Sequence, residues 1–265
     1  FEREIAILAS IRHPNVVNFI GACHKPGQRC LVTEYCARGS LDQVLHKSGL
    51  VLDLLKRVEF AMDVARGMAC LHAQRPVIIH RDLKTANLLV SARFEVKVAD
   101  FGLSRIKDAS HLQVSRAGLE GTIEYCAPEV LRGEPYTERC DVYSFGVVLH
   151  ELLTRQRPYA DQDVPVFLLM VNIGNGSLSL PDLPAEAATP GLIQLTGRCL
   201  AFSAADRPDF REVLSQLEGE YRSLRAAQQK QPRQQAAASA QQQQARLEQQ
   251  QQQQLGQQAH PGQRE

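Results

Sequence analysis

The chain has 265 residues, of which 44% are hydrophobic and 22% charged, and its formal net charge is +1. This length and apolar content suit a sizeable buried core, and no run of charged residues suggests a polyanionic partner such as a nucleic acid. Seven scattered cysteines without a Cys-x-x-Cys spacing favour a reduced, intracellular and hence cytoplasmic location, and no apolar run is long enough to span a membrane.

The first residues predict a helix followed by a β-hairpin. Residues 16–22 and 29–35 read as strands joined by a turn at Lys25-Pro26-Gly27. The helix precedes them and ends before His13-Pro14. Its apolar residues recur at helical spacing: Phe1, Ile5, Leu8 and Ile11.

Longer helices and a second hairpin follow. A helical period of apolar residues predicts a long helix over residues 54–71. Short apolar runs at 88–90 and 96–98 flank a polar turn and predict a hairpin. Residues 141–149 are apolar on nearly every face, which predicts a buried helix, with Asp141 as its N-cap.

Candidate catalytic and metal-binding residues flank the second predicted hairpin. The run His80-Arg81-Asp82-Leu83-Lys84-Thr85-Ala86-Asn87 precedes it, and Asp100-Phe101-Gly102 follows it. Asp82 is placed to orient a hydroxyl nucleophile and accept its proton, and Lys84 would bring a positive charge to a transferring phosphoryl group. Asn87 and Asp100 offer the hard oxygen atoms that Mg2+ prefers.

Two later motifs complete a recognisable set. Residues 121–129 read Gly-Thr-Ile-Glu-Tyr-Cys-Ala-Pro-Glu, and residues 206–210 read Asp-Arg-Pro-Asp-Phe. Taken together, the motifs resemble those of a protein kinase over roughly residues 1–224. The resemblance implies an α+β, two-lobed kinase-like fold in which the small lobe is truncated at its N-terminus and the large lobe is mainly α-helical. Residues 1–36 would be the remainder of the small lobe, and residues 37–225 the large lobe.

The resemblance also implies ATP and Mg2+ as cofactors and gives roles to individual residues. The implied metal ligands are Asn87 and Asp100. The implied catalytic residues are Asp82, Lys84, Asn87 and Arg81. The implied nucleotide-binding residues are the gatekeeper Thr33, the hinge residues Glu34 and Cys36, Leu89 and Asp100. The implied structural or regulatory residues are Glu4, His80, Phe101, Gly102, Thr122, Glu129, Asp141 and Arg207.

Some of these roles predict specific contacts. Glu129 would form a buried ion pair with Arg207, whose alternative reading is an ordinary surface cation. Asp141 would accept hydrogen bonds from the backbone beside His-Arg-Asp. Thr33 alone would read as a strand residue chosen for packing, and Cys36 reads as a small packing residue rather than a reactive thiol.

The motifs combine traits of two kinase branches. Lys84 and Thr122 resemble serine/threonine kinases, whereas residues 141–146 and 207–210 resemble the tyrosine-kinase branch. Both traits together indicate the tyrosine-kinase-like group with Raf-like members. We therefore expect a partial serine/threonine kinase domain that transfers the γ-phosphate of ATP to Ser or Thr of protein substrates in signalling. The alternatives are a noncatalytic kinase-like scaffold and a tyrosine or dual-specificity kinase.

The resemblance is incomplete at the beginning of the chain. Neither the glycine-rich loop nor the strand lysine that pairs with Glu4 is present, and the chain starts with Phe1 rather than Met. We expect a fragment that is inactive by itself, because loss of one preorganised charge-stabilising group typically costs roughly 3 to 4 kcal/mol.

The segment between Asp100 and Glu129 and the end of the chain are expected to serve regulation and to form a disordered tail, respectively. An upstream kinase is a candidate partner, because a phosphate added between Asp100 and Glu129 could dock on Arg81. The candidate phosphosites, which could equally be plain loop residues, are Ser104, Ser110 and Ser115. Residues 226–265 contain 18 Gln among 40 residues and no aromatic residue, which predicts a disordered tail.

Overall fold

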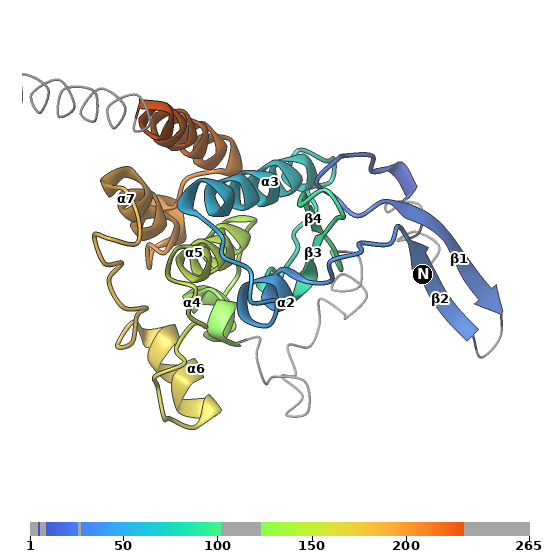
Figure 1. Ribbon diagram of the computed structural model, residues 1–265. Coiled ribbons are helices and arrows are strands. Elements are labelled where there is room, and N and C mark those ends of the chain that lie inside the picture. Colours follow the sequence, from blue (N-terminus) through green and yellow to red (C-terminus); the bar gives the residue numbers. More distant parts are fainter. Residues whose placement is uncertain (1–4, 6–8, 26–27, 102–122, 231–265) are drawn as a thin grey trace, which may run out of the picture. The chain divides into compact units, whose positions relative to one another are not determined.

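The computed structural model describes residue 5 and residues 9–25, 28–101 and 123–230. It divides into two units, Phe1–Tyr221 and Arg222–Glu265 (Figure 1). The first unit contains two separate antiparallel hairpins and a set of helices. Among the described residues, no helix combines the length and apolar character needed to cross a membrane.

The first hairpin consists of β1 (Phe19–Lys25) and β2 (Gln28–Thr33), with an irregular register between Phe19 and Gly21. The bounds expected from the sequence, 16–22 and 29–35, were wrong. Val16 and Val17 are buried and pair instead with Val98, since Val16 bridges to it and Val17 N donates to its carbonyl. The segment before β1 therefore pairs with the second hairpin instead of extending the first.

The second hairpin consists of β3 (Leu88–Val90) and β4 (Val96–Val98), as the sequence predicts. Both strands alternate buried and half-buried residues, so one face of each packs into the core. A three-residue 3-10 turn, η1 (Thr85–Asn87), leads directly into β3. The hairpin thus brings the chain from Asn87 to Asp100.

Two helices form the centre of the first unit. α3 (Leu54–His72) is capped by Asp53, whose carboxylate accepts from Lys56 N at 2.8 Å, and its expected helical period is confirmed. α5 (Arg139–Thr154) is buried at every position from Cys140 to Leu153. α3 packs on α5, and both also contact other elements of the unit (Figure 1).

The expected start of α5 was wrong. Asp141 is not the N-cap: the helix begins at Arg139, two residues earlier, and Glu138 precedes it without a side-chain capping bond. The Asp141 carboxylate lies in the first turn and accepts hydrogen bonds from His80 N and Arg81 N, which confirms the contact that the kinase resemblance implied. Its role is to bind another segment rather than to cap its own helix.

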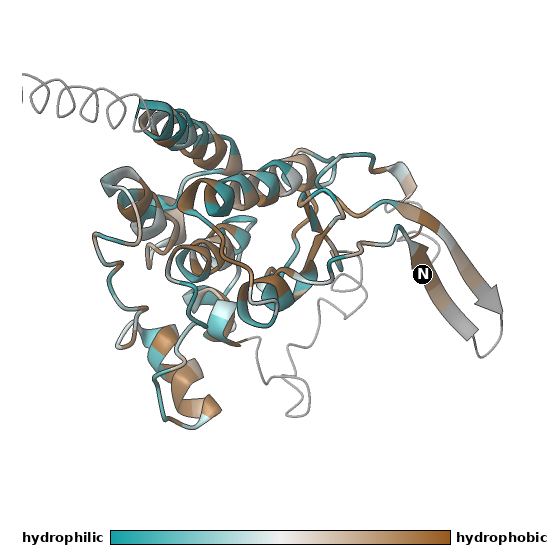
Figure 2. Cartoon of the chain, in the orientation of Figure 1, coloured by the Kyte–Doolittle hydropathy of each residue, from teal (hydrophilic) through white to brown (hydrophobic). Residues whose placement is uncertain are grey.

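Shorter helices complete the first unit. α2 (Leu41–His46) is capped by Ser40, which forms a capping box with Gln43. The others are α4 (Pro128–Leu131), α6 (Val166–Asn175), α7 (Pro190–Cys199), η3 (Ile123–Tyr125) and η4 (Ala204–Asp206). Figure 2 shows that α6 is strongly hydrophobic, and several of its apolar residues are exposed, among them Phe167 and Leu168.

Helical structure continues beyond the expected end of the large lobe. Residues 210–221 of the first unit are helical, and so are residues 222–230 of the second unit. The expected disordered tail from Ala226 is therefore corrected for residues 226–230. Ala, Gln, Lys and Arg all have high helix propensity, so they extend a helix although they bury little. The rest of the Gln-rich segment, 231–265, lies outside the described residues.

Candidate active site

The loop that contains Asp82 is held by α5. Asp141 Oδ2 accepts from His80 N at 2.8 Å, and Asp141 Oδ1 accepts from Arg81 N at 2.9 Å. His72 Nε2 lies 2.9 Å from Asp141 Oδ2. Arg81 has a φ of 68°, a left-handed backbone conformation that residues other than glycine rarely adopt. The buried carboxylate thus holds the loop in a backbone conformation that would otherwise be unfavourable.

The His80 imidazole joins this loop to the end of β4. The side chain is fully buried, and its Nε2 lies 2.9 Å from the carbonyl oxygen of Ala99. Because a carbonyl only accepts, Nε2 carries the hydrogen, and Nδ1 accepts from Asp82 N at 3.3 Å. His80 therefore fixes the position of Asp82 relative to the residue that precedes Asp100.

The two oxygen atoms of Asp82 have different surroundings. Oδ2 lies 3.0 Å from Lys84 Nζ and accepts from Asn87 Nδ2 at 2.8 Å. Asn87 Nδ2 also donates to the Asp82 carbonyl at 2.9 Å. Oδ1 is buried, and within the described part of the chain it has no hydrogen-bond partner. Asn87 and Lys84 therefore hold the carboxylate in place through Oδ2 alone.

Asn87 and Asp100 lie at the two ends of the second hairpin. Ala99 N donates to the Asn87 carbonyl at 3.0 Å, which ties the two ends together. The Asn87 amide nitrogen is bound to Asp82, so its side-chain oxygen remains for a ligand. Asp100 is exposed and has a φ of 59°. One amide oxygen and one carboxylate are ligand types that Mg2+ prefers when it also binds phosphate oxygens and water.

The segment that follows the implied hinge runs alongside β3. Arg38 N donates to Val90 O at 3.1 Å, and Val90 N donates to Gly39 O at 2.8 Å. Leu89, half-buried, forms an isolated bridge with Ser40. The hydrogen bonds place residues 38–40 next to the strand that follows Asn87.

The individual hinge residues differ in exposure. Thr33 is exposed at the end of β2, opposite Phe19. Glu34 N donates to Asn18 O, and the Glu34 carboxylate accepts from Lys97 Nζ at 3.1 Å. Cys36 is buried, and burial raises the pKa of its thiol, as expected of a packing residue.

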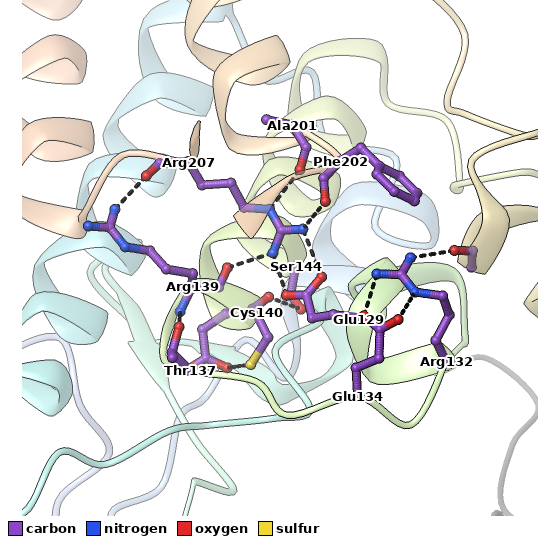
Figure 3. A network of polar contacts seen from close by, with 12 residues as sticks. Glu129, Arg132, Glu134, Thr137, Arg139, Cys140, Ser144, Ala201, Phe202 and Arg207 are labelled. Atoms are coloured by element: carbon purple, nitrogen blue, oxygen red, sulfur yellow. Dashed lines mark hydrogen bonds and ion pairs between the residues drawn. The ribbon is translucent and has the colours of Figure 1, made fainter. Parts of the chain in front are cut away.

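Arg207 and Glu129 form the expected buried ion pair, so the reading of Arg207 as a surface cation was wrong (Figure 3). The guanidinium donates to Glu129 Oε1 at 2.6 Å and to Oε2 at 2.8 Å, and it is 2% exposed. It also donates to the carbonyls of Ala201, Phe202 and Arg139. The bidentate geometry joins α4 to the segment after α7.

A second polar cluster was missed by the sequence analysis. Glu151 on α5 is fully buried, and burial raises its pKa. Tyr125 donates to Glu151 Oε2 at 2.7 Å, and Thr85 donates to Oε1 at 3.3 Å. His46 Nε2 lies 2.7 Å from Oε1. The available signal was a glutamate within an otherwise apolar helix, since such a group is rarely buried without partners.

Other implied residues lie outside the described part of the chain or next to its edge. Phe101 is 4% exposed and closes the described segment after β4. The residues that lie outside are Glu4, Gly102, Ser104, Ser110, Ser115 and Thr122.

Comparison with known proteins identifies related chains. The family model for protein tyrosine and serine/threonine kinases matches residues 1–217. The probable serine/threonine-protein kinase SIS8 of Arabidopsis thaliana is 42% identical over 82% of this chain and 21% of its own length. The serine/threonine-protein kinase CTR1 of Arabidopsis thaliana is 43% identical over 82% of this chain and 26% of its own length.

A relative with a different description also matches. The dual specificity protein kinase shkC of Dictyostelium discoideum is 36% identical over 82% of this chain and 42% of its own length. In each of these comparisons the chain therefore spans less than half of the relative.

Proposed function

Because the chain belongs to the protein tyrosine and serine/threonine kinase family, we propose that it carries part of the catalytic site of a Raf-like serine/threonine protein kinase. The reaction is transfer of the γ-phosphoryl group of ATP to a Ser or Thr hydroxyl of a protein substrate. The names of the relatives support serine/threonine specificity.

One observation carries the proposal: Asp82 has a buried oxygen, Oδ1, that lacks a hydrogen-bond partner within the described residues. An unsatisfied buried carboxylate oxygen is unfavourable by about 1 to 3 kcal/mol or more. A substrate hydroxyl that donated its hydrogen to Oδ1 would satisfy this oxygen and be oriented for attack. In this proposal Asp82 accepts the proton of that hydroxyl.

The neighbours of Asp82 support the same role. Asn87 Nδ2 and Lys84 Nζ both contact Oδ2. They hold the carboxylate in place and leave Oδ1 to accept a hydrogen bond from the substrate. Lys84 also brings a positive charge to within 3.0 Å of the proposed base. Such a charge would stabilise the negative charge of a transferring phosphoryl group.

Asn87 and Asp100 are the proposed metal ligands. Their oxygens match the preference of Mg2+ for hard ligands, and the bond from Ala99 N to Asn87 O keeps the two ends of the hairpin together. When bound, Mg2+ neutralises phosphate charge and orients the phosphate groups. The residues proposed to contact the nucleotide are Thr33, Glu34, Cys36 and Leu89.

Two backbone groups near the implied hinge support the nucleotide-binding part of the proposal. Among the described residues, neither Glu34 O nor Cys36 N takes part in a backbone hydrogen bond. An acceptor and a donor two residues apart suit the edge of a purine base. We also propose a cytoplasmic location, which seven free cysteines support.

The test is phosphoryl transfer by the protein expressed from its complete reading frame. ATP-dependent labelling of Ser/Thr peptides should fall by about 100- to 10,000-fold in Asp82→Asn, since a general base contributes about that much. Asp182→Asn, at an exposed position, is the matched control and should label normally. Equal labelling by wild type and Asp82→Asn would exclude this mechanism.

Two further measurements separate the alternatives. Phosphoamino-acid analysis should give phosphoserine or phosphothreonine, whereas phosphotyrosine would indicate dual or tyrosine specificity. Calorimetric titration with ATP and Mg2+ should show weaker binding for Asp100→Asn than for Asp182→Asn. A protein that neither binds the nucleotide nor labels a peptide would be a noncatalytic scaffold.

A further inference from the structure

Two cysteines face each other across the first hairpin. Cys23 on β1 is paired directly with Cys30 on β2, and both are free thiols. Directly opposed residues in an antiparallel pair have Cα atoms about 4.5 to 5.5 Å apart and share one face. Disulfides typically join residues whose Cα atoms are about 4.4 to 6.8 Å apart. The register therefore places Cys23 and Cys30 at a Cα separation that a disulfide can span.

Accessibility distinguishes this pair from the other cysteines. Cys30 is exposed and Cys23 is half-buried. Burial raises the pKa of the thiols of Cys36, Cys70, Cys126, Cys140 and Cys199, and that of Cys126 reaches about 12. A raised pKa lowers the fraction of reactive thiolate. None of these five residues lies in a strand of the described structure.

We propose that Cys23 and Cys30 are a modification site at which a peroxide forms a reversible cross-strand disulfide. The site is distinct from the residues proposed for phosphoryl transfer, and its chemistry does not depend on them. The hairpin ends at Thr33, so the disulfide would fix the strands immediately before the segment that contains Glu34 and Cys36.

The chemistry requires one molecule of hydrogen peroxide. The Cys30 thiolate attacks a peroxide oxygen, the O–O bond breaks, and the leaving hydroxide takes up a proton to become water. The Cys23 thiolate then attacks the sulfur of the Cys30 sulfenic acid, and the S–O bond breaks with release of a second water. The two thiols together lose two electrons and two protons, and the peroxide gains them.

The same geometry makes the disulfide reversible. Opposed Cβ atoms in a sheet are about 4.5 to 5.5 Å apart, whereas a disulfide holds them at about 3.5 to 4.5 Å. The strands must therefore approach by about an ångström, and the irregular register near Gly21 lies close to the pair. Because Cys30 is exposed, a small thiol reductant can attack its sulfur and restore both cysteines.

The sequence around the pair permits a direct test on the chain as printed. Trypsin cleaves after Arg29, which separates Cys23 and Cys30 into peptides 13–29 and 30–38. The reduced protein is treated with one equivalent of hydrogen peroxide, the remaining thiols are blocked with N-ethylmaleimide, and the digest is examined by mass spectrometry without reduction. We expect the two peptides to be joined, with the loss of two hydrogen atoms, and to separate after treatment with glutathione.

Two variants identify the partners. Peptide 30–38 also contains Cys36, so the linked species should disappear in Cys30→Ser and persist in Cys36→Ser. Both variants are compared with wild type by circular dichroism to verify the fold. The proposal is overturned if the link survives in Cys30→Ser, if it joins two different molecules on a non-reducing gel, or if the pair remains unlinked while other cysteines are oxidised.

Discussion

The hydroxyl of Tyr125 donates a hydrogen bond to Glu151 Oε2 at 2.7 Å, deep within the first unit. Thr85, in the loop after Asp82, donates to the other oxygen of the same carboxylate. One buried glutamate on α5 therefore binds both η3, which precedes α4, and η1, which precedes β3. The positions of these two segments relative to each other depend on this carboxylate.

Replacement of Tyr125 by Phe should test the strength of this connection. The variant leaves Glu151 Oε2 buried without its donor, and hydrogen bonds to charged groups contribute about 1.5 to 3 kcal/mol. We expect the free energy of unfolding in urea to fall by about that amount. Tyr221→Phe is the matched control, because Tyr221 donates at the same distance, 2.7 Å, to the part-exposed Glu59. A loss no larger than that of the control would show that Tyr125 contributes little.

Arg207 and Glu129 provide a second test of a buried contact. Arg207→Met removes the two guanidinium bonds to Glu129 and the three to backbone carbonyls, and it leaves Glu129, 6% exposed, without its cation. Breaking a buried pair in this way costs about 3 to 5 kcal/mol, and we expect chemical denaturation to show this loss.

The control and the double variant lie in the same region (Figure 3). Arg132→Met breaks the Arg132–Glu134 pair at the surface, where water replaces the lost contact, and should change stability far less. Adding Glu129→Gln to Arg207→Met should recover part of the loss, because no uncompensated charge remains. Additive losses in the double variant would contradict this account.

Two helical glycines should respond to alanine with opposite signs. A Cβ on Gly67 in α3 would lie 2.8 Å from Val98 Cγ2 and closer still to the Asn15 carbonyl oxygen. Overpacking of this kind costs about 1 to 3 kcal/mol. A Cβ on Gly197 in α7 meets no atom within 4 Å, so Gly197→Ala should stabilise the protein by about 0.4 to 1 kcal/mol. Thermal unfolding of both variants checks the two signs.

His150 should make stability depend on pH. Burial lowers its pKa from 6.5. Its Nε2 donates to Pro181 O at 2.9 Å, and within the described structure Nδ1 is buried without a partner. Protonation of Nδ1 in the folded state is therefore unfavourable, whereas the unfolded chain binds this proton near pH 6.5.

The sign of the effect follows from this difference in proton binding. The contribution of neutral His150 is complete above pH 6.5 and is lost as the pH falls below 6.5 towards the lower folded-state pKa. In His150→Gln this contribution is absent. Urea denaturation at several pH values should therefore show that wild-type stability falls more steeply with acidification than that of the variant. Parallel curves would contradict the prediction.

The sequence predicted the elements whose pattern is local. The period of α3, the alternation in β3 and β4, and the apolar run of α5 all identify their elements, because burial of one face or all faces is visible in the residue types. The bounds of β1 were wrong because Val16 and Val17 pair with Val98, a partner about eighty residues away that no local pattern reveals.

The candidate site shows the same limit. The residue types of Asp82 and Asn87 predicted their chemistry. That Oδ2 of Asp82 is hydrogen-bonded while Oδ1 lacks a partner among the described residues depends on the folded loop. Asp141 was recognised as important and assigned the wrong local role, because a carboxylate at the beginning of a helix also resembles a cap. Its bonds from His80 N and Arg81 N, sixty residues earlier, are confirmed, and they were expected from the kinase resemblance rather than from any local pattern.

The bonds from His80 N and Arg81 N to Asp141 have a consequence for fluctuations. Asp141 lies in a helix that is buried from Cys140 to Leu153, so it cannot release these amides unless the centre of the unit opens. Loops usually exchange their amide hydrogens through small local openings. In this loop, the amide hydrogens of His80 and Arg81 should exchange with deuterium no faster than α5 unfolds.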